Sequence, residues 1–107
     1  MSNRETIGLL EEMILLIVLK NQEINGAEVS REYQEAFRKN ISLPAIIAVL
    51  KRLEKKGLLT SHVGEPKKER GGRRKRLYEA TLQGYEVVAE IQKFRNESWK
   101  NIPYFDI

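Results

Sequence analysis

The clearest structural signal in the chain lies in residues 42–57, which read SLPAIIAVLKRLEKKG. Ser42 suits a helix N-cap, Pro44 falls in the first turn, where its missing N–H costs nothing, and Gly57 suits the position just after a helix end. We therefore expect a helix that ends near Lys56. Its buried side is predicted from helical spacing to consist of Leu43, Ile46, Ile47, Leu50 and Leu53. The opposite side is predicted to be small and apolar at its start and cationic at its end, with Ala45, Val49, Arg52 and Lys56.

Two further helices are predicted before this segment. Residues 6–20 carry apolar side chains nearly all round, which is typical of a helix that is buried on several sides. Asn25-Gly26 is a turn signal, and amphipathic spacing predicts a second helix from about Ala27 to Lys39. The longest nearly apolar run, Met13 to Leu19, is far shorter than the ~20 residues that a membrane span needs, so we expect no membrane partner.

A hairpin and a last helix are predicted after it. Leu58 to Val63 alternates like a strand, Leu77 to Ala80 fits a return strand, and the loop between them is long and contains Gly71-Gly72. Thr81 suits the N-cap of a final helix that reaches about Lys100. Three helices followed by a hairpin and another helix indicate a winged helix-turn-helix.

The expected fold class is therefore mainly α with a small β-hairpin. We expect residues 1–80 to form a winged helix-turn-helix DNA-binding domain and residues 81–107 to form a C-terminal dimerisation helix and tail. The two parts are expected to make one compact domain, because the chain has only 107 residues and no linker or repeat is visible.

Composition excludes several classes of function. The chain has no cysteine, which excludes disulfides, thiolate zinc sites and a cysteine nucleophile, and its single histidine (His62) and single aspartate (Asp106) argue against a catalytic triad or a histidine metal site. No glycine-rich phosphate loop follows a strand. No signal pattern opens the chain. We therefore expect a cytoplasmic protein that is not an enzyme, needs no cofactor or metal, and binds a partner.

The positive charge is concentrated in two segments. The net charge of +4 is the balance of +3 in residues 42–57, +6 in residues 67–76 and a mildly acidic remainder. Such segregation suggests a face that meets a polyanion, although a solvated basic loop is the simpler explanation. The predicted DNA-binding residues are Ser42, Ala45, Val49, Arg52 and Lys56 in the third helix and Lys67, Lys68, Arg70, Arg73, Arg74, Lys75 and Arg76 in the loop. We expect Ala45 and Val49 to contact thymine methyl groups, Ser42 to hold a phosphate with the helix start, and the loop cations to contact the DNA backbone.

The first and last helices carry more apolar side chains than a core of this size needs. A chain this short buries only ~60–68% of its unfolded surface, so it gains stability from association. We expect a homodimer whose interface contains Leu10, Ile14, Ile17, Tyr85, Val88, Ile91, Phe94, Trp99 and Ile102.

Over roughly residues 6–98 the sequence resembles the PadR-like family of winged-helix transcriptional regulators. The likeness rests on NGAEV at 25–29, LKRLEKKGL at 50–58, GRRK at 72–75, LY at 77–78 and TLQG at 81–84. The chain departs from the family where Gly26-Ala27 replaces the usual Gly-Tyr and where PAIIAV at 44–49 replaces the usual Gly-Thr-Leu-Tyr-Pro-Ala. The resemblance to the short members implies that the last helix packs across a two-fold axis against the partner's first helix. The departures imply that the chain reads a different DNA sequence or relies less on base contacts.

These observations predict a sequence-specific, double-stranded DNA-binding transcriptional regulator that acts as a homodimeric repressor. Two alternatives stay open. The apolar start of the third helix also fits a winged-helix protein-interaction module without DNA binding. The resemblance also implies a regulator that senses a planar aromatic small molecule at the dimer interface near Tyr85, Phe94 and Trp99, although a dimer core is the simpler explanation of aromatic residues at helical spacing.

Overall fold

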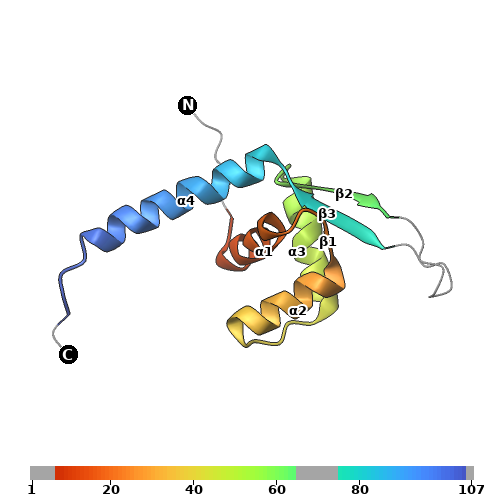
Figure 1. Ribbon diagram of the computed structural model, residues 1–107, viewed down its shortest axis with the longest axis horizontal. Coiled ribbons are helices and arrows are strands. Elements are labelled where there is room, and N and C mark those ends of the chain that lie inside the picture. Colours follow the sequence, from red (N-terminus) through yellow and green to blue (C-terminus); the bar gives the residue numbers. More distant parts are fainter. Residues whose placement is uncertain (1–6, 65–74, 106–107) are drawn as a thin grey trace.

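The computed structural model describes residues 7–64 and 75–105. Four helices and three strands lie within these two ranges (Figure 1). They are α1 (Leu9–Lys20), β1 (Ile24–Asn25), α2 (Gly26–Phe37), α3 (Leu43–Lys55), β2 (Leu59–Val63), β3 (Arg76–Ala80) and α4 (Leu82–Lys100). The arrangement confirms the predicted fold class, a mainly helical winged helix with a small antiparallel sheet.

Side-chain caps fix the helix starts that the sequence signals. Ser42 Oγ accepts the N–H of Ala45 at 3.3 Å at the start of α3, and Pro44 occupies its first turn. Thr81 Oγ1 accepts the N–H of Gly84 at 3.0 Å at the start of α4 and also donates to the carbonyl of Gly57 at 2.8 Å. Each cap satisfies a backbone donor that the helix itself cannot pair, so both helices begin where the sequence predicts.

The sheet contains one strand that the sequence does not predict. β1 has only two residues, and its Ile24 lies opposite Tyr78 of the central strand β3. β2 pairs with the other edge of β3, which gives the antiparallel order β1-β3-β2. Two residues are too few to show the alternation of a strand, so the sequence indicates only the hairpin and the turn at Asn25-Gly26.

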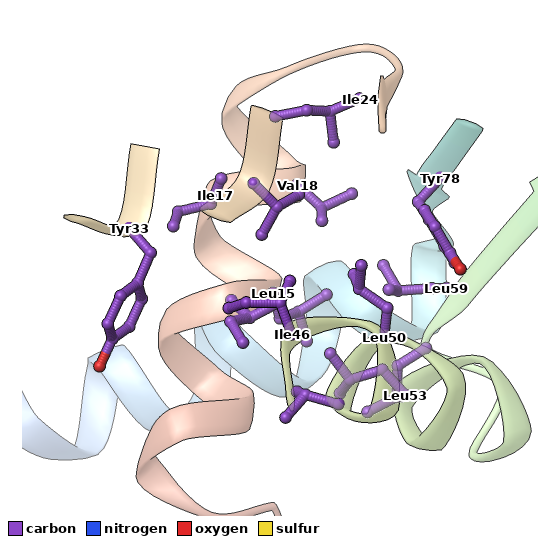
Figure 2. Packing of buried hydrophobic residues seen from close by; sticks show 14 of the residues in the cluster. Leu15, Ile17, Val18, Ile24, Tyr33, Ile46, Leu50, Leu53, Leu59 and Tyr78 are labelled. Atoms are coloured by element: carbon purple, nitrogen blue, oxygen red, sulfur yellow. The ribbon is translucent and has the colours of Figure 1, made fainter. Parts of the chain in front are cut away.

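The core lies between α1, α3 and the sheet. Figure 2 shows Leu15 of α1 and Leu50 and Leu53 of α3 gathered there, with Tyr78 of β3 at its edge. The fully buried side chains come from α1, β1, α2, α3 and β3 and include Ile14, Leu15, Val18, Ile24, Val29, Ile46, Leu50, Leu53 and Tyr78.

The predicted orientation of α3 is wrong by part of a turn. Val49 is 2% exposed and belongs to the core, whereas Leu43 is 44% exposed and Ile47 is half-buried. The buried side is Ile46, Val49, Leu50 and Leu53, at the spacing of one helix face. Two overlapping apolar stripes exist in this helix, and contact with α1 selects the one that contains Val49.

Close backbone approach at two glycines brings the helices together. A Cβ atom at Gly26 would lie 2.5 Å from Ile47 Cδ1, and one at Gly84 would collide with the backbone carbonyl of Leu58. Glycine therefore allows the start of α2 to rest on α3 and the start of α4 to rest on the segment that follows α3.

α4 leaves the core after its first turns. Gly84 and Val88 are buried, but from Gln92 to Lys100 every side chain of the helix is exposed. Figure 1 shows this half of α4 extending away from the other helices.

Candidate nucleic-acid interface

The exposed face of α3 is the side opposite Val49 and Leu50. Pro44, Ala48, Lys51 and Lys55 lie there at spacings of four, three and four residues, and all four are exposed. Sequence reasoning missed these residues because it took the side that carries Ala45 and Val49 to be the outward face of the helix. The burial of Val49 in the core reveals them, because it moves the outward face of α3 by part of a helical turn from the predicted one.

Ala45 and Ser42 remain at the accessible start of the helix. Both are exposed, but the Ser42 hydroxyl already serves as the cap of α3. Pro44 has no N–H, and the N–H of Ala45 is donated to Ser42. The helix start therefore offers fewer donors to a phosphate than its sequence suggests.

Val49 does not face solvent, so the expectation that it contacts DNA is wrong. Arg52 and Lys56 lie on the same side of α3 and reach toward α1. Arg52 Nε donates to Glu11 Oε2 at 3.4 Å, and Lys56 Nζ lies 3.2 Å from both oxygens of the same carboxylate. The structure thus places these two cations in ion pairs within the fold.

The Glu11 carboxylate is adapted to this role. Its burial alone would raise its pKa, but the N–H of Gly8, 2.8 Å from Oε1, and the cations of Lys56 and Arg52 together lower the pKa below its usual value. The carboxylate therefore stays ionised and holds both cations against α1.

Two of the predicted loop cations lie within the described residues of the hairpin. Lys75 and Arg76 are exposed, and the backbone carbonyl of Lys75 accepts the N–H of Gly64 at 2.8 Å. Arg76 donates to Ser61 Oγ at 3.0 Å, and that hydroxyl donates to Glu54 of α3 at 2.8 Å. The other predicted loop cations, Lys67, Lys68, Arg70, Arg73 and Arg74, lie outside the described residues.

A shallow groove joins the start of α3 to the loop end of the hairpin strands. It has a volume of about 220 Å³. Its lining includes Asn25, Gly26, Ala27, Leu43, Ile47, Lys75, Arg76 and Tyr78. Leu43 and Ile47 stand beside the exposed Pro44 and Ala48 on α3, so the groove continues into the outward face of the helix. The start of α3 and the two described hairpin cations therefore share one side of the molecule.

A second surface, formed by α4, is apolar. Phe94 and Trp99 are 70% and 75% exposed, and Tyr85 and Ile102 are also exposed. Leu10 and Ile91 are half-buried. Exposed apolar residues that sequence reasoning did not assign to this surface are Leu9, Leu16, Leu82, Tyr104 and Phe105.

Three of the predicted interface residues belong instead to the core. Ile14, Ile17 and Val88 are all buried within the single chain, so they offer no surface to a second copy. α1 is apolar on nearly all sides, and its pattern alone does not show which side the chain itself covers.

A groove of about 450 Å³ separates the start of α1 from α4. Arg95 of α4 crosses it to donate to Glu12 Oε1 at 2.7 Å. Glu12 is 3% exposed, and its Oε2 has no hydrogen-bond partner within residues 7–64 and 75–105. The remaining lining includes Ile7, Leu9, Val87, Ile91 and Phe94.

A search for membrane-spanning segments among the described residues finds no helix of sufficient length and apolar character.

Comparisons with known proteins match this geometry. The family model described as the transcriptional regulator PadR-like family matches residues 15–97. A PadR-like transcriptional regulator from Bacillus cereus strain ATCC 14579 is similar with a TM-score of 0.71 and 24% sequence identity, over 87% of this chain and 86% of that chain. A PadR-like transcription factor from Bacteroides fragilis is similar with a TM-score of 0.74 and 24% identity, over 90% and 91% of the two chains.

A third similar structure is that of Bacillus subtilis PadR in complex with operator DNA. The TM-score is 0.69 and the identity 19%, and the match covers 94% of this chain but 51% of that one. A search of the curated proteins finds no match. At these identities the structural likenesses show the shared fold.

Proposed function

Because the chain belongs to the PadR-like family of transcriptional regulators, we propose that it acts in the cytoplasm as a homodimeric repressor that binds specific double-stranded DNA. The observation that carries the proposal is the shared side of the molecule formed by the outward face of α3 and the loop end of the hairpin strands. In a winged helix-turn-helix, the second helix of the motif enters the major groove, and the similar Bacillus subtilis protein was solved with operator DNA.

The exposed residues divide into two kinds of contact. Ala45 and Ala48 are small enough to let α3 approach base edges and thymine methyl groups. Lys51 and Lys55, one and two turns further along, provide charge for phosphates at the groove edge. Lys75 and Arg76 extend the positive charge along the flanking backbone, together with Lys67, Lys68, Arg70, Arg73 and Arg74 of the same segment.

Arg52 and Lys56 take a different role in this proposal. Their ion pairs with Glu11 hold α3 against α1 and so set the angle at which α3 is presented. Repression follows from occupation of the promoter by the bound dimer.

The dimer is supported by the exposed apolar surface of α4. Phe94 and Trp99 lie where α4 has left the core, and Ile102 follows the end of that helix. Burying a large apolar side chain contributes about 1.5–3 kcal/mol. A two-fold pair would set its α3 copies in successive major grooves, about 34 Å apart. Sedimentation equilibrium should give twice the chain mass, and Phe94→Ser with Trp99→Ser should give the single-chain mass. A wild-type monomer at micromolar concentration would contradict the dimer.

DNA binding is tested by selection from a random-sequence duplex library, followed by titration of the selected duplex at several salt concentrations. We expect one enriched pseudo-palindromic sequence, because a two-fold dimer reads two equivalent half-sites. The logarithm of the affinity should fall with the logarithm of salt concentration by about 0.9 for each neutralised phosphate. No enrichment together with a flat salt dependence would favour the protein-interaction alternative.

A planar aromatic effector is a second proposal, favoured by the groove between α1 and α4. Phe94 supplies an aromatic face, and Glu12 Oε2, a buried atom without a hydrogen-bond partner among the described residues, would accept a hydrogen bond from a ligand that enters the groove. Trp99 is the single tryptophan and lies five residues beyond the groove-lining Phe94 on α4, so a change in its fluorescence would report such binding. Fluorescence that stays constant with planar phenolic and heteroaromatic compounds would remove this proposal.

A further inference from the structure

The outer face of the sheet gathers three side chains that bind metals in many proteins. In the register of the sheet, His62 of β2 lies opposite Leu77 of β3. Tyr78, which follows Leu77 in β3, points into the core. Because side chains alternate along a strand, Leu77 and Glu79 point to the opposite, outer face, and His62 shares it. Glu23 precedes β1 at the other edge of β3, so three separate segments meet on this face.

The distances between the three side chains are short. His62 Nε2 lies 3.3 Å from Glu23 Oε2, and His62 Nδ1 lies 4.0 Å from Glu79 Oε2. One ligand atom from each residue can be chosen so that all three lie within 4.8 Å of one another. All three side chains are partly exposed, so an ion can reach them from solvent and the carboxylates can turn without disturbing the core.

These donors match the preferences of zinc. Zn²⁺ binds imidazole nitrogen and carboxylate oxygen at about 2.0–2.2 Å, so two ligands of a tetrahedral ion stand roughly 3.4 Å apart. The distance from His62 Nε2 to Glu23 Oε2 already has this value within 0.1 Å. Glu79 Oε2 lies nearer the other ring nitrogen, Nδ1, so a turn of the partly exposed Glu79 side chain would bring the third ligand to the same ion, and water would complete the shell.

We propose that Glu23, His62 and Glu79 bind one divalent first-row metal ion, with Zn²⁺ the best match, on the outer face of the sheet. The ion would join the segment before β1 to both strands of the hairpin. The site lies apart from the exposed face of α3, so it does not depend on the proposed DNA binding.

The proposal departs from the expectation drawn from composition. A single histidine and no cysteine argue against a histidine metal site, but glutamates from two other segments supply the remaining ligands. Their approach depends on the pairing of β1 with β3, which the sequence does not reveal. Direct polar contacts of His62 with the two carboxylates, without an ion, would give the same distances, and the following experiment separates the two cases.

The test uses the full chain without an affinity tag, because His62 is then the only histidine. Its imidazole C–H signals in the proton NMR spectrum should shift with added ZnCl₂ and saturate at one ion per chain. MgCl₂ should leave them in place, because Mg²⁺ prefers an all-oxygen shell. Calorimetry on the same samples gives the affinity.

Variants assign the ligands. Removing a hydrogen-bond partner of a ligand commonly weakens metal binding by about 10–100-fold, so Glu23→Gln, Glu79→Gln and His62→Gln should each weaken zinc binding at least tenfold. Glu97→Gln, an exposed glutamate of α4, is the matched control and should leave the affinity unchanged. Unmoved His62 signals at millimolar zinc, or equal affinity in all four variants, would overturn the proposal.

Discussion

Four basic residues stand between positions 51 and 56, and the fold sorts them into two pairs with different surroundings. Lys51 and Lys55 lie on the outward face of α3, opposite the core. Arg52 and Lys56 reach back to the Glu11 carboxylate of α1. Arg52 and Lys56 follow Lys51 and Lys55, respectively, by one position, which is about 100° around a helix. The rotation of α3 about its own axis, and not composition, therefore decides which cations face Glu11 and which face outward.

The largest expected effect tests the rotation itself. Val49→Asp places a carboxylate in the core without a partner and should lower the free energy of unfolding by more than about 3 kcal/mol. Ala48→Asp, one position earlier on the exposed face, should change it by less than about 1 kcal/mol. Urea denaturation measures both. Equal losses in the two variants would show that Val49 and Ala48 have similar surroundings.

The second test compares the two cation pairs on DNA. If Lys51 and Lys55 each neutralise one phosphate, Lys51→Ala with Lys55→Ala removes about four contacts per dimer. The salt slope should then fall by about 3.6, and affinity for the selected duplex at 0.2 M salt by roughly 100-fold.

Arg52→Ala with Lys56→Ala is the matched pair for this measurement. Its salt slope should stay near that of the wild type, because these cations face Glu11. If both double variants lower the salt slope equally, the assignment of Lys51 and Lys55 to DNA and of Arg52 and Lys56 to Glu11 is contradicted.

The third test removes the Glu11 carboxylate, which binds Arg52 and Lys56. Glu11→Gln should lower the free energy of unfolding by about 1 kcal/mol near neutral pH, because the partly exposed ion pairs lose their anion. The pKa of Glu11 is lowered in the fold, so its contribution is fully present above the unfolded value of about 4.5 and is lost as the pH falls below it. The stability difference from the wild type should therefore shrink between pH 6 and pH 3. A difference that is constant with pH would contradict the ion pairs.

The smallest effect concerns the neighbouring carboxylate. Glu12 pairs with the half-exposed Arg95 through Oε1, while its Oε2 is buried and has no partner within the described chain. Glu12→Gln loses the ion pair but also removes a charge that burial disfavours, so the free energy of unfolding should change by only about 0.5 kcal/mol. Thermal unfolding of the two variants side by side measures the contrast. A larger loss for Glu12→Gln than for Glu11→Gln would reverse the order.

Features that depend on neighbouring residues were predictable from the sequence. Ser42 and Thr81 cap their helices through bonds that span three residues, so the starts of α3 and α4 follow from local sequence. The winged helix-turn-helix order follows in the same way, because each helix and hairpin strand carries its own periodicity.

Features that depend on distant partners were not predictable. β1 exists because Ile24 meets Tyr78, more than fifty residues away. Val49 is buried because α1 packs on one of two possible apolar stripes, and the same packing turns Arg52 toward Glu11. The predicted helix and hairpin remain the candidate site, but the structure turns two of the predicted cations, Arg52 and Lys56, toward Glu11, since the rotation of a helix is a tertiary property.

Glu11 and Glu12 are consecutive residues, and they hold different parts of the molecule. One anchors the end of α3, and the other anchors the middle of α4 through Arg95. Because adjacent positions of a rigid helix turn together, a rotation of α1 that moves its ion pair with α4 would also move its ion pair with α3. Two neighbouring carboxylates of α1 thus link α3 to the middle of α4, in addition to the direct contacts of Thr81 with Gly57 and of Gly84 with Leu58.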